Sequence, residues 1–180
     1  WSSDVCSSDL STFAAIRNAD GDLGKLRAAL DALGLTDTTD IIVTSDHGFS
    51  TISKQSASSP AAKASYGDVP AGFLPPGFLA LDIAKALALP VFDPEARNAR
   101  LADDAHPSRG NALLGPDPAR PQIVVAANGG SDLLYLPAKD RALAVKTIEA
   151  LLAQDYVSGI FVDDVFGVIP GTLPLSAINL

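Results

Sequence analysis

Apolar residues recur at helical spacing in three stretches of the chain. In the first, residues 11–35, leucines three and four positions apart line one face, and Gly34 stands where a helix C-cap is expected. The second stretch, 78–89, is closed by Pro90, a residue that cannot continue a helix. The third, 139–154, carries its apolar residues on one face. The pattern therefore predicts three helices.

Short β-branched or apolar runs between turn residues predict the strands. Residues 40–45 follow the first helix after a short polar loop and have the composition of a strand buried on both faces. Two further runs, 122–127 and 132–136, flank Asn-Gly-Gly at 128–130, which is typical of a hairpin turn. Residues 159–162 are expected to form a last strand.

The order helix, tight loop, buried strand indicates the fold class. We expect an α/β protein with a mostly parallel sheet, flanking helices and long loops. The long loops are predicted at 51–76 and 97–120, where Ser, Pro, Gly, Asp and Asn are frequent and no period is visible.

The first ten residues, Trp1 to Leu10, differ in character from the rest. Their sequence WSSDVCSSDL back-translates to TGG AGT TCA GAC GTG TGC TCT TCC GAT CT, a common sequencing-adapter end read in frame. The chain also contains no Met. We expect residues 1–10 not to be native, and residues 11–180 to be a partial domain truncated at both ends.

Charge and composition exclude several classes of function. The chain carries 13 Lys and Arg against 21 Asp and Glu, a formal charge of −8. Without Asp4 and Asp9 the remaining 170 residues carry −6, the wrong sign for general binding to nucleic acid or an anionic membrane. The single Cys, Cys6, excludes an internal disulfide or a thiolate metal cluster. The longest apolar stretch, 78–92, is interrupted and too short to span a bilayer.

One group of residues carries recognisable chemistry. Asp46, His47 and Gly48 come just past the apolar run Ile41–Val43, after Thr44 and Ser45, at the expected carboxyl end of a strand. Ligands bind at such strand ends in open α/β sheets, and a carboxylate beside an imidazole suits Zn²⁺ or a similar divalent ion. In the alternative interpretation, Asp46 only caps the loop and His47 lies on the surface.

The helix at 22–34, the short loop and the strand ending in IIVTSDHGFS together resemble the alkaline phosphatase superfamily, in particular its type I phosphodiesterase/nucleotide pyrophosphatase branch. The resemblance implies that Asp46 and His47 hold one ion of a two-metal site, with two zinc ions in the intact parent. It also implies a hydrolase acting on a small phosphate ester, and it favours a periplasmic or secreted location.

Other parts of the superfamily pattern have no counterpart here. The resemblance implies an upstream Thr or Ser nucleophile, but Ser11 and Thr12 stand at a helix start and are expected to be N-caps. It also implies an Asp four residues before a His, a spacing that neither His47 nor His106 has. His106 is followed by Pro where the family has Gly, so we expect it to be a solvent-facing loop residue and not a third ligand. We therefore expect the chain by itself not to hydrolyse esters.

Several alternatives remain open at this point. Within the same superfamily, a sulfatase or a phosphomutase would differ in the nucleophile. A non-catalytic α/β binding domain would use Asp46 and His47 only to shape a loop. Lys54 and Lys63, in the loop after the site, are expected to be solvated and only secondarily to meet a substrate phosphate.

Overall fold

The structure, a computed structural model, describes residues 10–44 and 54–178, with side chains from Phe13 onward. The chain divides into two compact units, residues 1–52 and 53–180.

The first unit contains helix α1, Leu10–Ala32, followed by the short 3₁₀ helix Thr36–Thr38. The helix ends in a Schellman motif. The Leu35 N–H donates to the Leu30 carbonyl at 2.9 Å and the Gly34 N–H to the Asp31 carbonyl at 3.0 Å. Gly34 has φ 66°, the left-handed conformation that favours glycine. The predicted first helix and its glycine cap are confirmed.

The strand predicted at 40–45 is wrong over its described part, residues 40–44, which belong to no strand. Ile42 is 86% exposed and Val43 is 78% exposed. A β-branched run forms a doubly buried strand only when neighbouring strands supply hydrogen bonds and helices cover both faces. The described residues of the first unit contain helices and no strand, so this run has neither.

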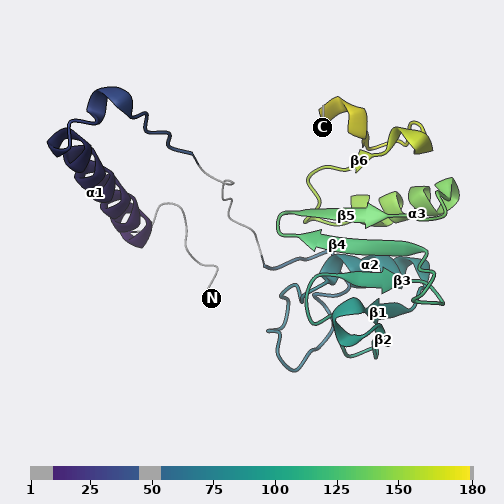
Figure 1. The fold of residues 1–180 in the computed structure, drawn as a ribbon. Coiled ribbons are helices and arrows are strands. Elements are labelled where there is room, and N and C mark those ends of the chain that lie inside the picture. Colours follow the sequence, from purple (N-terminus) through teal and green to yellow (C-terminus); the bar gives the residue numbers. More distant parts are fainter. Residues whose placement is uncertain (1–9, 45–53, 179–180) are drawn as a thin grey trace. The chain divides into compact units, whose positions relative to one another are not determined.

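The second unit is built on a five-stranded sheet with the order β2-β1-β3-β4-β5 (Figure 1). Its strands are β1 Val91–Asp93, β2 Ala99–Arg100, β3 Ala112–Leu114, β4 Ile123–Asn128 and β5 Ser131–Tyr135. All neighbouring pairs in this sheet are antiparallel. The predicted hairpin is confirmed, because Asn128 pairs with Ser131 across the two glycines of the turn.

The expectation of a mostly parallel sheet is therefore wrong. Parallel neighbours need a crossover of a dozen or more residues, usually through a helix. Here α3, Arg141–Leu152, is the only α-helix between two strands of the described chain, and it connects β5 to β6, Phe161–Val162, outside the main sheet. Within the described residues, parallel pairing occurs only between β6 and β7, Leu173–Pro174, in a separate two-stranded sheet.

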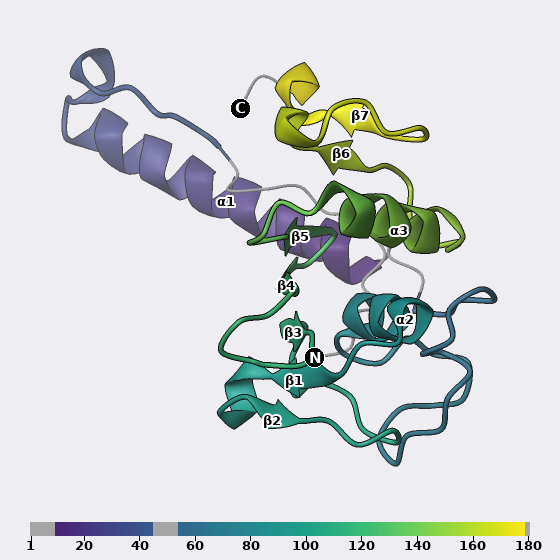
Figure 2. The same cartoon turned by 90° about the vertical axis from the view of Figure 1, so that its right-hand side faces the viewer.

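Two α-helices cover one face of the five-stranded sheet (Figure 2). They are α2, Phe78–Leu87, and α3. Both confirm the predicted helices at 78–89 and 139–154. The predicted strand at 159–162 is confirmed in part, as β6. Further 3₁₀ helices lie at Pro94–Ala96, Asp164–Phe166 and Leu175–Ile178.

The core lies between these helices and the sheet. Ile83 of α2 packs with Leu114, Ile123 and Val125 of the strands, and Leu151 of α3 belongs to the same cluster. Full burial of such a side chain contributes about 1.5–3 kcal/mol, so this cluster holds helices and sheet together. In the described part of the chain, no helix is both long and apolar enough to cross a membrane.

The two long loops are more structured than the sequence indicates. Ser59, Ala61 and Ala62 are buried although they belong to the predicted surface loop 51–76. The stretch 97–120 contains strands β2 and β3. Strands of two or three residues are too short to display an alternating pattern, which is why the sequence does not predict them.

Candidate functional site

The predicted metal pair, Asp46 and His47, lies outside the described residues, as does Gly48. The structure therefore gives no geometry for the Asp46–His47 pair. Across residues 10–44 and 54–178, no three His, Asp or Glu side chains are grouped so that they could hold a metal ion.

His106 is bound on both sides of its ring. Its Nδ1 lies 2.8 Å from the carbonyl oxygen of Pro107, and its Nε2 lies 3.1 and 3.2 Å from the two carboxylate oxygens of Asp68. The ring also packs edge-on against Tyr66, with 5.3 Å between the ring centres. The hydrogen bond from His106 holds the pKa of Asp68 below its ordinary value.

This arrangement leaves neither nitrogen of His106 free. A ligand or general base needs a nitrogen lone pair directed at a metal or a substrate proton. In the described structure, Nδ1 is hydrogen-bonded to the backbone carbonyl of Pro107 and Nε2 to the carboxylate of Asp68. His106 thus lies in a loop as expected, but it is not solvent-facing, because its side chain is only 12% exposed.

A second polar group surrounds the Asp82 side chain of α2, which is 3% exposed. Its carboxylate accepts the Ala61 N–H at 2.7 Å and the Tyr156 hydroxyl at 3.0 Å. Burial raises the pKa of Asp82, although hydrogen bonds from Ser59, Ala61 and Tyr156 act in the opposite direction. Burial, followed by the charge of Asp82, also raises the pKa of Tyr156. The group joins α2, the 59–61 loop and the turn after α3.

A third group of hydrogen bonds, around Asp155, fixes residues 56–58 near the start of the predicted loop 51–76. The exposed carboxylate of Asp155 accepts the Ser56 hydroxyl at 2.5 Å, the Ala57 N–H at 2.8 Å and the Ser58 hydroxyl at 2.9 Å. The hydrogen bond from Ser56, with those from Ala57 and Ser58, lowers the pKa of Asp155 to about 2. A carboxylate with this many donors is a structural acceptor, because its lone pairs are already engaged.

The buried carboxylate of Asp93, at the end of β1, has a comparable role. It accepts the N–H and the hydroxyl of Ser108 and the N–H of Glu95. Burial acts to raise the pKa of Asp93, but these hydrogen bonds outweigh it and the pKa lies below its ordinary value. This fixes the segment after His106 to the sheet.

Two pairs of adjacent aspartates remain, Asp103–Asp104 and Asp163–Asp164. Asp103 and Asp104 lie in an exposed turn. Asp163 caps a 3₁₀ helix by accepting the Val165 N–H at 2.9 Å, and Asp164 accepts the Ser176 N–H and hydroxyl.

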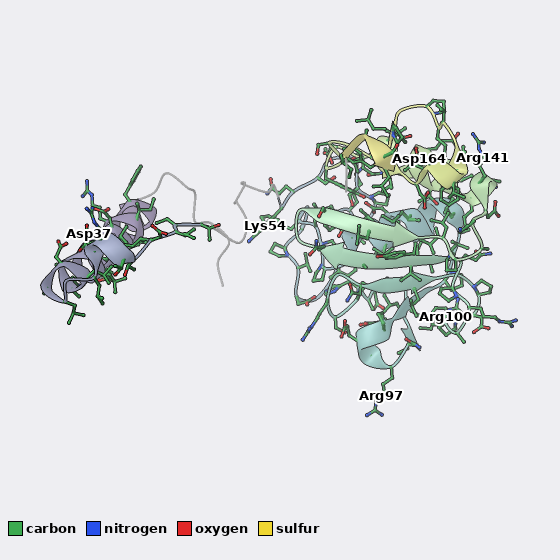
Figure 3. The ribbon with its side chains drawn as sticks, turned by 45° about the horizontal axis from the view of Figure 1, so that its top comes forward. Asp37, Lys54, Arg97, Arg100, Arg141 and Asp164 are labelled. Atoms are coloured by element: carbon green, nitrogen blue, oxygen red, sulfur yellow. The ribbon has the colours of Figure 1, made fainter. Side chains whose placement is uncertain are left out.

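Several basic side chains of the second unit lie apart from one another. Lys54, Arg97 and Arg100 extend from separate places on the unit (Figure 3). Lys63 donates to the Ser58 carbonyl at 3.4 Å. Arg141 donates to the carbonyls of Phe166 and Val168 and so ties α3 to the C-terminal segment.

The comparison with known families assigns the chain. A family model described as "Type I phosphodiesterase / nucleotide pyrophosphatase" matches residues 5–105, more than half of the 180 residues. The chain belongs to this family. The type I phosphodiesterase/nucleotide pyrophosphatase family is part of the alkaline phosphatase superfamily and is generally hydrolytic. No curated protein and no solved structure matches the chain.

The family match includes Asp46 and His47 and ends one residue before His106. It therefore covers the segment in which sequence reasoning placed the chemistry. Sequence reasoning missed the pairs Asp68–His106 and Asp82–Tyr156. Their partners are 38 and 74 positions apart, and no local pattern connects residues at such separations.

Proposed function

We propose that the chain is part of a metal-dependent phosphodiesterase or nucleotide pyrophosphatase, in which Asp46 and His47 bind one divalent ion. The observation that carries the proposal is the family match over residues 5–105, which contains the SDHG sequence. A small phosphate ester is the proposed substrate. Zinc is the proposed metal, two ions in the intact parent, and a periplasmic or secreted location remains part of the proposal.

The chemistry of the two side chains fits this proposal. Carboxylate oxygen and imidazole nitrogen are both ordinary ligands of Zn²⁺. Bound divalent ions supply positive charge to the oxygens of a phosphoryl group, which an acidic chain with scattered cations does not supply itself. Catalytic zinc sites use three protein ligands, so Asp46 and His47 alone make an incomplete site. We therefore propose that the 180-residue chain binds zinc weakly and does not turn over esters by itself.

Zinc titration of the chain, followed by calorimetry, tests the metal pair. The wild type is expected to bind zinc, and Asp46→Ala and His47→Ala are expected to weaken that binding. Asp40→Ala is the matched control, since it removes a carboxylate six residues away. His106→Ala accounts for binding by the second histidine. Equal zinc uptake by the wild type and both site variants would contradict the proposal and favour a non-catalytic binding domain.

A chromogenic phosphodiester tests the statement on activity. We expect no turnover above background for the chain with zinc present. Turnover that disappears in Asp46→Ala would refute the proposed inactivity, while leaving the metal assignment intact. The same variant in the longer parent is expected to lose phosphodiesterase activity, and a sulfatase would instead cleave a chromogenic sulfate ester.

A further inference from the structure

Residues 65–72 form a segment with few ties to the rest of the second unit, which we call the flap. None of its side chains is fully buried, and Tyr66 and Val69 are half-buried. Beyond its C-terminal end, Phe73 pairs with Gln55, and the Leu74 N–H donates to the Lys54 carbonyl at 2.7 Å. In the described chain, the hydrogen bonds and the ring contact that join the flap itself to another segment all involve His106.

The segment that carries His106, by contrast, is anchored by buried contacts. Pro107 is fully buried against Gly77, where an added Cβ would lie 2.5 Å from the proline Cγ. Ser108 is bonded to the buried carboxylate of Asp93. The His106 side chain is only 12% exposed, whereas Asp68 on the flap is 73% exposed. The flap is therefore the partner that can move.

The protonation of the ring decides how strongly it holds the flap. Both neighbours of the ring, the Pro107 carbonyl and the Asp68 carboxylate, only accept hydrogen bonds. The imidazolium donates from both nitrogens and carries a charge opposite to that of Asp68. The neutral ring has one N–H, so it donates to only one of the two acceptors, and it has no charge that attracts Asp68.

We propose that Asp68 and His106 form a pH-dependent latch, which holds the flap while His106 is an imidazolium and releases it as the pH rises. The groups that face the ring are Asp68 and Tyr66, both from the flap. Asp103 and Asp104, on the same loop as His106, lie in an exposed turn and make no hydrogen bond to the ring in the described chain.

Amide hydrogen exchange of the full chain between pH 5.5 and 8.5 tests the latch, because histidines titrate in this range. After correction for the intrinsic pH dependence of exchange, the flap is expected to exchange about two- to fivefold faster at the upper end, the range that a partly exposed ion pair supports. Strand β4 is the internal reference and is expected to show no such change.

Two variants make the test specific. Asp68→Ala is expected to give fast flap exchange with no pH dependence beyond the intrinsic one. His106→Phe retains a ring beside Tyr66 and is expected to give the same result. Asp117→Ala, which removes an exposed carboxylate paired with Arg120, is the matched control and should behave as the wild type.

The latch is refuted if flap exchange in the wild type does not change with pH, or if Asp68→Ala keeps the wild-type change. Should His106→Phe not fold, Asp68→Ala still decides the outcome, since its side chain is exposed. The result does not depend on metal binding, so it is separate from the test of the proposed function.

Discussion

The hydroxyl of Tyr156 donates to the buried carboxylate of Asp82 across 3.0 Å and links the turn after α3 to α2. Tyr156→Phe removes this donor and leaves the carboxylate buried with one partner fewer. Hydrogen bonds to charged groups contribute about 1.5–3 kcal/mol, so we expect the free energy of unfolding to fall by about that amount. Urea unfolding measures the change.

Tyr135→Phe is the matched control for this variant. Tyr135 lies on the edge strand β5, is 54% exposed and does not belong to the buried core cluster. We expect its loss of a hydroxyl to change the free energy of unfolding by less than about 0.5 kcal/mol. If the two variants lose equal stability, the Asp82–Tyr156 bond does not stabilise the unit.

The lowered pKa of Asp155 predicts that the folded chain loses stability in acid. Its pKa falls from an ordinary value of 3.8 to about 2 in the folded chain, because Ser56, Ala57 and Ser58 donate to the ionised form. A lowered pKa means that the unfolded chain binds more protons in this range, so the stabilisation is present above about pH 4 and is lost as the pH falls toward 2. Asp155→Asn is expected to be less stable at neutral pH and to show a smaller loss between pH 4 and 2.

The same titration separates Asp155 from Asp82, because the pKa of Asp82 is shifted in the opposite direction. A raised pKa means that the folded chain holds its proton longer, so ionisation of Asp82 costs stability as the pH rises through its folded-state pKa. An Asp155→Asn profile parallel to the wild type between pH 4 and 2 would show that Asp155 is not held by these donors.

Replacement of Gly110 by alanine is expected to create a steric clash, which a second substitution should remove. A Cβ added at Gly110 would lie 2.2 Å from the Cβ of Ala127 on β4. Gly110→Ala is expected to reduce the free energy of unfolding by about 1–3 kcal/mol, the usual cost of overpacking. The double variant with Ala127→Gly removes the clash, and thermal unfolding should show it to be more stable than Gly110→Ala alone. Additive losses in the double variant would mean that the two sites do not touch.

Replacement of Arg97 by glycine is expected to stabilise the second unit. Its φ is 56° and that of Asn98 is 58°, so two consecutive residues of the β1–β2 connection are left-handed. A non-glycine residue pays about 1–2 kcal/mol for this conformation, and glycine does not. After the greater chain entropy of glycine in the unfolded state is subtracted, Arg97→Gly should raise the free energy of unfolding by about 0.5–1 kcal/mol. Arg100→Gly, in strand β2, should lower it, and thermal unfolding of both compares the signs.

The sequence predicted the three α-helices because each has a sustained apolar period, and the first two also have a residue that ends them, Gly34 and Pro90. Gly34 is an example in which a single residue determined the local geometry. The hairpin was predictable for the same reason, since two adjacent glycines at 129–130 specify a tight turn. Strand β3 was not predictable, because three residues are too few to display a period.

Strand direction and pairing could not be obtained from these local patterns. The run Ile41–Val43 has the composition of a buried strand, yet the residues needed to cover it are not in the described part of its unit. The parallel sheet was expected from the order of one helix and one run, whereas the pairing is decided by short connections between β1 and β5.

The candidate functional residues also differ in whether the sequence alone could identify them. Asp46 and His47 are adjacent in the chain, so the sequence alone identified them as a candidate metal pair, and the family match covers both. Asp68 and His106, like Asp82 and Tyr156, come together only through the fold. Local patterns arise from bonds between near neighbours and can be read along the chain. Contacts between distant residues depend on how the whole core packs, and only the tertiary structure decides them.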